Sequence, residues 1–245
     1  MKPLIIANWK MSPTTLEGAK LLFEAVKKEV KNIKKVEIVI CPPFPYLPIL
    51  NNGSPTSITT SIIRLGGQDC FWEEKGAFTG EVSPKMLKDL GCKYVIIGHS
   101  ERRRYFEETD EMINKKIKAA LKVGLRPILC IDKISQIPNF LRKRGGRRGR
   151  SPLRPKKDLG GVIIAYEPLF AIGTGKPCSI EKAKKMRLLI LRNLNKNLPV
   201  LYGGSVNSQN ARDYIEKAKF QGLLVGGTSL NAQEFIKLVK NVSQT

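Results

Sequence analysis

The chain is poor in the residues that build metal sites and disulfide frameworks. Its 245 residues include a single histidine, His99, and five widely spaced cysteines that form no C-x-x-C pair: Cys41, Cys70, Cys92, Cys130 and Cys178. Zinc sites need several closely spaced cysteine or histidine ligands, so we expect no metal. An odd number of scattered cysteines is typical of reduced thiols in a cytoplasmic protein, and we expect that location.

Long apolar runs are also missing. No run approaches the roughly 18 residues that a membrane-spanning helix needs, and the apolar stretch within residues 1–8 is too short for a signal peptide. We interpret that stretch as a buried first strand. With 42% apolar residues, the chain can bury a substantial core, and we expect one domain over residues 1–245 and no membrane partner.

Acidic residues are scarce beside basic ones. There are 21 aspartates and glutamates against 43 lysines and arginines, which gives a formal net charge of +22. One interpretation is a polyanion partner such as nucleic acid. The other is a basic surface that draws in small anionic substrates. Part of the excess is local, because residues 142–157 hold nine lysines and arginines and no acid.

Eight short β-rich runs recur at intervals of about 25 to 40 residues. They are rich in valine and isoleucine and apolar on both faces, which is typical of strands in a covered parallel sheet. The expected strands are residues 4–9, 36–41, 62–66, 94–98, 127–131, 162–166, 200–202 and 223–225.

Helical patterns lie between most of these runs. Ser83 followed by Pro84, and Thr109 followed by acidic residues, are typical helix N-termini. The expected helices are residues 16–30, 85–90, 110–123, 181–195, 211–218 and 232–239. Alternation repeated eight times suits either a closed (β/α)₈ barrel or a doubly wound open sheet. The chain after the first run reads K-M-S-P rather than G-x-G-x-x-G, so the sequence favours the barrel.

One segment, residues 132–160, breaks the alternation. A helix of about four turns is expected there, but the chain is rich in glycine, proline and arginine, which oppose a stable helix. We interpret residues 132–160 as an atypical basic segment of the single domain, a disordered basic loop without a function of its own.

Polar side chains stand where several of the expected strands end. Asn8 and Lys10 follow the first strand, His99 and Glu101 the fourth, and Glu167 the sixth. Catalytic groups of parallel barrels gather at this end of the barrel. Each residue alone could be a solvated charge or a structural group, but together they predict a catalytic site.

These residue types suit proton transfer next to a carbonyl group. Glu167 can remove the proton, while His99 and Lys10 stabilise the enediolate oxygen that develops. Two glycine turns with a hydroxyl, residues 203–205 and 226–228, offer backbone N–H groups for a phosphate. Residues 168–176 begin with proline and end glycine-rich, which predicts a lid that excludes water.

The motifs together resemble one enzyme family. The matching strings are N-W-K-M at residues 8–11, G-A-F-T-G-E at 76–81, G-H-S-E-R-R at 98–103, A-Y-E-P at 165–168, A-I-G-T-G-K at 171–176, Y-G-G-S-V at 202–206 and L-V-G-G at 224–227. In this order they resemble the triosephosphate isomerase family from end to end, except for residues 132–160. The resemblance implies a (β/α)₈ TIM barrel that interconverts D-glyceraldehyde 3-phosphate and dihydroxyacetone phosphate in glycolysis and gluconeogenesis, without a cofactor.

The resemblance also implies roles for individual residues. Glu167 is the base and His99 the electrophile, while Asn8 and Lys10 contact and orient the substrate. Glu101 supports Lys10 or His99, and Ser100 holds Glu167 when the lid is open. The phosphate-binding N–H groups belong to Gly173, Ser205, Gly226 and Gly227. The lid comprises Pro168, Ala171, Ile172, Gly173, Thr174, Gly175 and Lys176, with Tyr202 as its latch.

The resemblance further implies a homodimer, or sometimes a tetramer. The third strand–helix loop, residues 68–86, would insert Phe78 and Thr79 into a pocket of the partner, unless Phe78 folds onto its own barrel.

The sequence departs from the family pattern at two places. Leu169-Phe170 replaces the usual Val-Trp, and Cys130-Ile131-Asp132-Lys133 replaces C-[IV]-G-E. The missing fifth helix would leave a strand face uncovered, at a cost of several kcal/mol at about 25 cal/mol per Å².

We also interpret the abrupt basic block as the possible product of two compensating frameshifts, which DNA sequencing through codons 132 to 160 would test. Two other functions remain open at this stage. The chain could be another phosphate-binding barrel isomerase, or residues 142–157 could bind nucleic acid, although the sequence makes a nucleic-acid partner the less favoured one.

Overall fold

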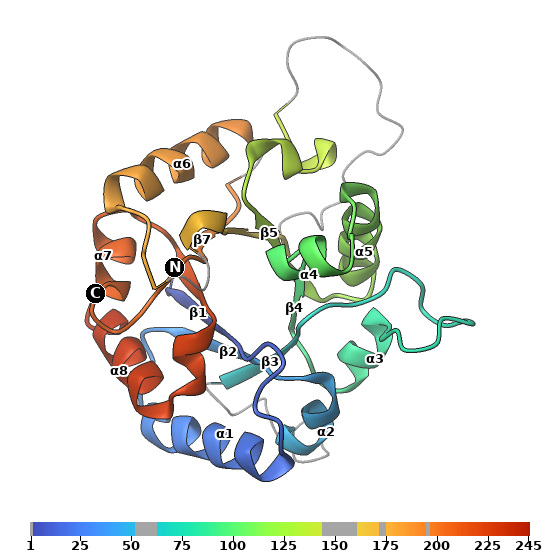
Figure 1. Cartoon of the computed structure of the whole chain (residues 1–245), viewed down its shortest axis with the longest axis horizontal. Helices are drawn as coiled ribbons and strands as arrows, with labels where there is room; N and C mark the ends of the chain where they lie inside the picture. The colour runs from blue at the N-terminus through green and yellow to red at the C-terminus, as the bar shows by residue number, and fades with distance from the viewer. Residues whose placement is uncertain (1, 52–62, 144–160, 172–174, 195–196) are drawn as a thin grey trace.

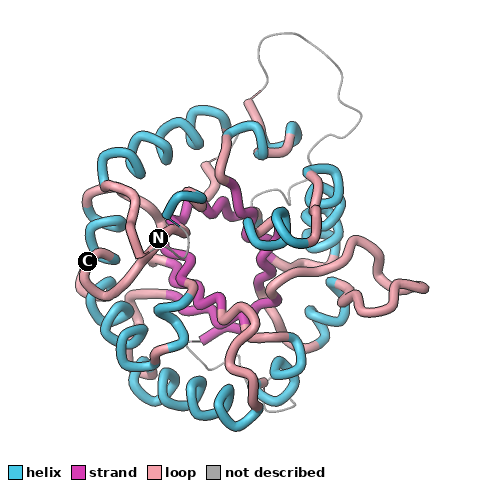
Figure 2. Tube along the Cα trace, viewed as in Figure 1, coloured by secondary structure: helices cyan, strands magenta, loops and turns pink. Residues whose placement is uncertain are grey.

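The computed structural model describes residues 2–51, 63–143, 161–171, 175–194 and 197–245. Eight parallel strands close into a barrel in the order β1 to β8, and helices surround it (Figures 1 and 2). Each strand pairs with its neighbours in sequence, and β8 pairs with β1, for example Leu4 with Gly222. The predicted (β/α)₈ barrel is therefore confirmed.

The strands lie where the apolar runs predicted them, within one or two residues. Their bounds are β1 Leu4–Asn8, β2 Glu37–Cys41, β3 Ile63–Gly67, β4 Tyr94–Ile97, β5 Arg126–Ile131, β6 Ile163–Tyr166, β7 Val200–Tyr202 and β8 Gly222–Val225. Ile62, the predicted start of the third strand, lies outside the described residues.

All six predicted helices are present, and the described residues form two more α-helices. The helices are α1 Leu16–Val30, α2 Leu47–Leu50, α3 Pro84–Asp89, α4 Ser100–Tyr105, α5 Asp110–Lys122, α6 Ile180–Asn193, α7 Ala211–Glu216 and α8 Ala232–Val242. The hydroxyl of Ser83 accepts a hydrogen bond from the N–H of Met86, and that of Thr109 from the N–H of Met112, so both predicted N-caps are confirmed. The two helices without a prediction, α2 and α4, are too short to show a helical apolar stripe.

The apolar side chains form two cores, as the alternation along each strand requires. One fills the barrel and includes Ile6, Val39, Ile96 and Leu201. The other lies between the barrel and the helices and includes the strand residues that point outward. The barrel interior is therefore packed, and a binding cavity can form only at the ends of the strands.

The atypical segment covers its strand better than we expected from the sequence. After β5, two short 3-10 turns, η3 Ile134–Gln136 and η4 Asn139–Leu141, precede residue 143. Ile137 and Leu141 are fully buried in the outer core. Residues 127–131 of β5 are all buried, so the predicted uncovered strand face is wrong, and the described part of the segment forms ordered turns. Residues 144–160, with most of the basic run, lie outside the described residues.

All five cysteines are free thiols buried in the fold. In the part of the chain that the structure describes, no helix is both long and apolar enough to span a membrane.

Candidate active site

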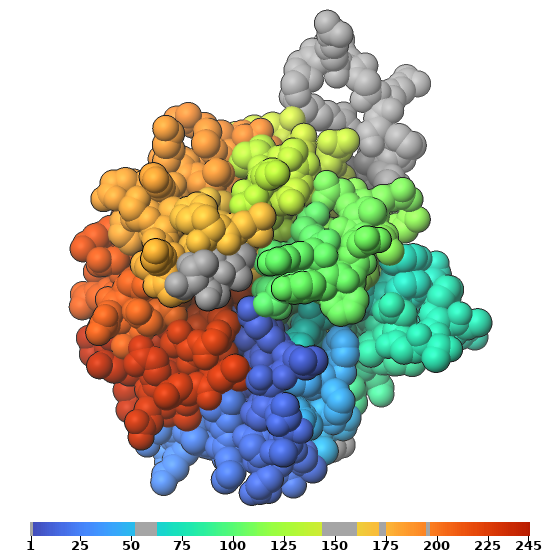
Figure 3. Space-filling view, viewed as in Figure 1, coloured from blue at the N-terminus to red at the C-terminus, as the bar shows by residue number. Residues whose placement is uncertain are grey.

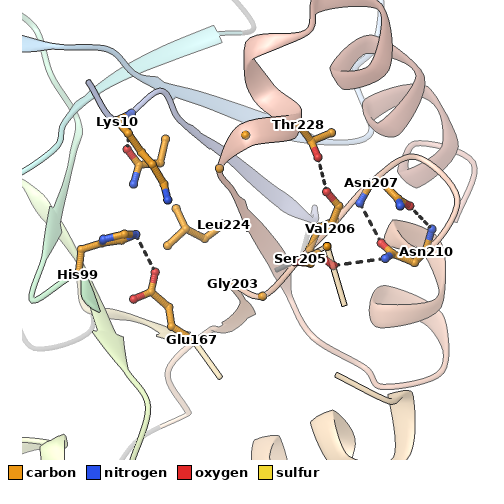
Figure 4. A pocket seen from close by; sticks show the side chains of 15 residues that line it. Lys10, His99, Glu167, Gly203, Ser205, Val206, Asn207, Asn210, Leu224 and Thr228 are labelled. Atoms are coloured by element: carbon orange, nitrogen blue, oxygen red, sulfur yellow. Dashed lines mark hydrogen bonds and ion pairs between the residues drawn. The ribbon is translucent and has the colours of Figure 1, made fainter. Parts of the chain in front are cut away.

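A cavity of about 240 Å³ opens at the carboxyl ends of the strands. Figure 4 shows its two sides: Lys10, His99 and Glu167 lie together on one, and the loops after β7 and β8 lie on the other. The lining residues are Asn8, Lys10, His99, Glu167, Gly175, Gly203, Gly204, Ser205, Val206, Asn207, Asn210, Leu224, Gly226, Gly227 and Thr228.

Lys10 is held in a strained backbone conformation directly after β1. Its φ of 54° lies in the left-handed region that residues with a Cβ atom rarely adopt. The side-chain oxygen of Asn8 accepts a hydrogen bond from the Lys10 N–H at 3.0 Å, and Gln68 Nε2 donates to the Lys10 carbonyl at 2.7 Å. Backbone strain of this kind is concentrated at functional sites. Here it aims the Lys10 ammonium across the mouth of the barrel.

His99 ends the β4 loop and caps helix α4. Its Nδ1 accepts a hydrogen bond from the Glu101 N–H at 3.3 Å, and its Nε2 lies 3.1 Å from Glu167 Oε1. A nitrogen that accepts carries no proton, so this geometry places a proton on Nε2, the atom that faces the cavity.

The charge state of His99 depends on Glu167. Burial lowers the pKa of His99, but the charge of Glu167 and the hydrogen bond to it outweigh burial, so the pKa is raised above its ordinary value. The Glu101 N–H opposes protonation, because a protonated Nδ1 would point its own hydrogen at that N–H. A ligand that separates Glu167 from Nε2 therefore favours the neutral ring.

Glu167 is a buried carboxylate, 2% exposed, at the end of β6. Its Oε2 accepts a hydrogen bond from the Ser100 N–H at 3.1 Å. Burial raises the pKa of Glu167, but the charge and hydrogen bond of His99, with the Ser100 N–H, outweigh burial and hold the pKa below its ordinary value. The carboxylate is thus ionised and ready to accept a proton. The predicted contact with Ser100 is made by the backbone N–H.

Glu101 lies beside both Lys10 and His99. Its Oε1 forms an ion pair with the Lys10 ammonium, and its Oε2 lies 3.5 Å from His99 Nδ1. We predicted support for either Lys10 or His99, and the geometry places the carboxylate against both. Helix α4, which the sequence pattern missed, sets this geometry because both His99 and Glu101 lie in its first turn.

The opposite side of the cavity is built from the two predicted glycine turns. Gly226 lies so close to Lys10 that a Cβ atom there would come within 3.2 Å of the lysine Cε. Thr228 Oγ1 donates to the Val206 carbonyl at 2.6 Å, which ties the turn after β8 to the turn after β7. Backbone N–H groups in such turns suit an anion such as phosphate.

Two asparagines that we did not predict organise the turn after β7. Asn207 and Asn210 accept hydrogen bonds from each other's N–H groups at 3.0 Å, and Asn210 Nδ2 donates to the Ser205 carbonyl at 3.3 Å (Figure 4). The spacing N-S-Q-N is a common signal for side chains that hydrogen-bond nearby backbone, and it could have identified this turn.

The predicted lid is described only at its two ends. At the first end, Ser205 Oγ donates to the Ala171 carbonyl at 2.5 Å; at the second, the Cys178 N–H donates to the Tyr202 hydroxyl at 3.0 Å. Pro168 is buried, and Lys176 is exposed. Gly175, with a φ of 70°, lines the cavity. Ile172, Gly173 and Thr174 lie outside the described residues, so their predicted roles have no structural counterpart here.

Gly204 is a further residue that the sequence prediction omitted. A Cβ atom at this position would lie 2.2 Å from the Tyr202 hydroxyl. Only glycine therefore leaves that hydroxyl free to reach Cys178.

Phe78 and Thr79 do not line the cavity and lie on the loop of residues 68–86. This loop projects from the barrel beside α3 (Figures 1 and 3). Phe78 is 43% exposed, and its ring packs on that of Phe71 in the same loop, with centroids 4.6 Å apart. Phe78 therefore packs within its own loop while presenting an apolar surface to the outside.

The base of the projecting loop is fixed by buried charges. Lys116 on α5 forms ion pairs with Asp69, at 2.6 Å, and with Glu108. Burial raises the pKa of Asp69 to about 6, against the opposing charge of Lys116. Further out, Lys122 pairs with Glu74 at 2.6 Å. These ion pairs attach the loop of residues 68–86 to α5.

No three histidine, cysteine, aspartate or glutamate side chains within the described ranges gather closely enough to hold a metal ion. The residues that line the cavity can supply proton transfer by Glu167 and stabilisation of an oxyanion by His99 and Lys10.

Comparison with known proteins agrees with the motifs and the geometry. A family model described as triosephosphate isomerase matches residues 3–242. The chain is 44% identical to the triosephosphate isomerase of Dehalococcoides mccartyi strain BAV1, over 99% of this chain and 98% of that protein. It is 42% identical to those of Endomicrobium trichonymphae, over 98% of both chains, and Dictyoglomus thermophilum, over 98% of this chain and 99% of that one. The chain belongs to the triosephosphate isomerase family.

Proposed function

We propose that this protein interconverts D-glyceraldehyde 3-phosphate and dihydroxyacetone phosphate by proton transfer through an enediolate. The observation that carries the proposal is one cavity with Glu167 and His99 at one end and two glycine turns at the other. Its volume, about 240 Å³, is below the roughly 300–1,000 Å³ of sites for drug-sized ligands, as a three-carbon substrate requires.

The residues divide the reaction between them. Glu167 removes a proton from the hydroxyl-bearing carbon next to the carbonyl group and returns it to the former carbonyl carbon, while the hydroxyl proton passes from its oxygen to the former carbonyl oxygen. The Nε2–H of His99 and the ammonium of Lys10 stabilise the oxygen that becomes negative in between. Asn8 and Glu101 hold Lys10 in place through the contacts described above.

The substrate enters between groups that now contact each other. Glu167 Oε1 and His99 Nε2 lie 3.1 Å apart. A bound substrate breaks this contact, and Glu167 and His99 then each contact the substrate. Separation also removes the main cause that raises the pKa of His99, which favours the neutral imidazole as hydrogen-bond donor.

The phosphate is held at the far end of the cavity, in our proposal by the N–H groups of Gly173, Ser205, Gly226 and Gly227. The net charge of +22 draws a dianionic substrate toward the protein. No cofactor or metal is needed for this reaction, because each step moves only a proton.

A substrate panel tests the proposed function. We expect the purified protein to isomerise D-glyceraldehyde 3-phosphate and dihydroxyacetone phosphate, and to leave phosphorylated pentoses, hexoses and amino sugars unchanged. Turnover of a larger sugar phosphate in preference to the triose would instead support another phosphate-binding barrel isomerase.

Removal of the latch hydroxyl is expected to slow the enzyme. Tyr202→Phe leaves the buried Cys178 N–H without its acceptor, so we expect kcat/KM to fall about tenfold, which corresponds to about 1.4 kcal/mol. Steady-state kinetics measures the effect. Gly204→Ala, which crowds the same hydroxyl, should cause a loss at least as large.

Tyr46→Phe is the matched control for the latch variant, because Tyr46 lies in the turn after β2 and outside the cavity. We expect its kinetics to equal those of the wild type. If Tyr202→Phe also behaves as the wild type, Tyr202 is not a latch.

We propose that the protein forms a homodimer through residues 68–86, and that it is cytoplasmic. The partly exposed Phe78 and the exposed Met86 support an apolar contact. The five free thiols support a reducing location.

Phe78→Asp should abolish this association, because it places a charge in the apolar contact. Light scattering should give the mass of a monomer for Phe78→Asp and of a dimer for the wild type; a tetramer would mean a second interface. Leu21→Asp, at an exposed leucine of α1, is the control and should keep the wild-type mass. A wild-type monomer would overturn the proposal.

A further inference from the structure

The backbone directly after Glu167 is held by a side chain of the atypical segment. The last rung of the β5–β6 ladder is the bond from the Glu167 N–H to the Ile131 carbonyl, at 2.8 Å. Pro168 has no N–H to donate. The next N–H, that of Leu169, donates to Asp132 Oδ1 at 3.3 Å. The Asp132 side chain therefore adds one hydrogen bond between the segments after β5 and β6, directly beyond the catalytic glutamate.

Asp132 is itself fixed by its neighbours. Gln136 Oε1 accepts hydrogen bonds from the N–H groups of Asp132, at 2.7 Å, and of Lys133, at 3.1 Å. The turn is thus closed by a side chain placed four residues after Asp132, and it presents the carboxylate toward β6.

Arg142 completes the turn from its other end. Its guanidinium donates to the carbonyls of Ile137, Ser135 and Ile134, at 2.7, 2.6 and 3.1 Å. The Ile134 carbonyl also accepts the Ile137 N–H within the 3-10 turn, so the arginine adds to the backbone hydrogen bonds of this segment. Residues 132–142 are therefore an ordered unit held by backbone hydrogen bonds of two 3-10 turns and by the side chains of Gln136 and Arg142.

The chain after Glu167 is unevenly packed. Pro168 and Ala171 are buried, but Leu169 between them is 53% exposed. A second cavity of about 490 Å³ lies beside Leu169, lined in part by Asp132 and Gln136. Packing therefore holds Leu169 only weakly, and the hydrogen bond from its N–H to Asp132 adds a contact at this position.

We propose that Asp132 is a positioning residue of the isomerisation, which holds the Glu167 backbone in register through the N–H of Leu169. The inference rests on the proposed function. It assigns a role to the segment in which the sequence departs from the family pattern. In place of a covering helix, residues 132–142 form turns that direct the Asp132 carboxylate toward the backbone after Glu167. Because proton abstraction depends on sub-ångström placement of the base, a loosened backbone lowers turnover without weakening substrate binding.

The test compares three substitutions in the same segment. Asp132→Ala removes the acceptor, and we expect kcat to fall about tenfold with KM within twofold of the wild type. Asp132→Asn keeps an oxygen at the same position, so it should retain at least half of the wild-type kcat. Ser135→Ala, whose side chain is exposed and whose backbone carbonyl is kept, is the control and should match the wild type.

A pH profile separates positioning from a purely electrostatic role. If the charge of Asp132 acted on Glu167, Asp132→Asn and Asp132→Ala would be equally impaired, and the acid limb of kcat/KM would move in both. We expect unshifted profiles in both variants. Equal impairment with shifted profiles overturns the proposal.

Gln136→Ala provides a second route should Asp132→Ala fail to fold. Gln136→Ala keeps the Asp132 carboxylate but removes the acceptor that holds the N–H groups of Asp132 and Lys133. We therefore expect kcat to fall two- to threefold, and we expect no further loss when Gln136→Ala is combined with Asp132→Ala. Unchanged kcat in both Asp132→Ala and Gln136→Ala, with an active wild type, overturns this inference alone. An inactive wild type overturns the proposed function instead.

Discussion

Glu167→Asp is expected to lower kcat by at least about a hundredfold while KM stays within about twofold of the wild-type value. The shorter side chain withdraws the carboxylate by roughly one ångström, and a displacement of that size costs about 10²-fold in rate. Substrate binding is kept because the phosphate is held at the far end of the cavity, by residues that the substitution leaves in place. Steady-state kinetics in both directions of the reaction measures the two parameters separately.

Glu181→Asp is the matched control for this substitution. Glu181 lies in the first turn of α6, and its side chain is exposed, so the same loss of one methylene should leave kcat unchanged. A Glu167→Asp enzyme with wild-type turnover would remove Glu167 from the role of base.

His99→Gln should reduce kcat by about 10²- to 10³-fold, the usual cost of losing one donor to a developing oxyanion. The Nε2–H of His99 faces the cavity, and an amide cannot reproduce both its position and its acceptance of the Glu101 N–H. Single-turnover kinetics checks whether the loss lies in the chemical step.

The same variant should also change the pH dependence. Burial raises the pKa of Glu167, and His99 is the largest influence that lowers it. Without His99 the folded-state pKa of Glu167 rises, so the active, ionised form is lost at a higher pH on acidification. The acid limb of kcat/KM should therefore move to higher pH. An unmoved limb with full turnover would contradict both assignments.

The barrel was predictable because its signal is local and repeated. Most strands are apolar on both faces, although β3 carries Arg64. The helices carry their own start signals, of which Ser83 and Thr109 make the predicted contacts. The order of the strands then follows from the alternation, since strands joined by helices pair in sequence around a closed barrel.

The candidate site was predictable as a set of residues and not as a set of contacts. The motifs placed Lys10, His99 and Glu167 at strand ends, and the structure brings them to one cavity. The conformation of Lys10, with its positive φ, and the bridging position of Glu101 depend on partners far along the chain, such as Gln68. Spacing alone carries no signal for them.

Asp132 shows most clearly what the sequence could not reveal. We interpreted residues 132–160 by composition, and their described part, residues 132–143, holds two short 3-10 turns in place of the four-turn helix that the alternation predicts. Composition could not show that Gln136 and Arg142 hydrogen-bond the backbone of these turns, or that Ile137 and Leu141 join the outer core. Those are tertiary contacts, which only the fold defines.

Isomerisation of D-glyceraldehyde 3-phosphate in D₂O is the most direct test of proton transfer through Glu167. A proton carried by a carboxylate can exchange with solvent before it returns to carbon, whereas a hydride shift keeps the original hydrogen. We predict that ¹H NMR finds deuterium on the carbon of dihydroxyacetone phosphate that received the hydrogen, at least in part of the product. Turnover that yields product free of deuterium at that carbon would contradict the mechanism.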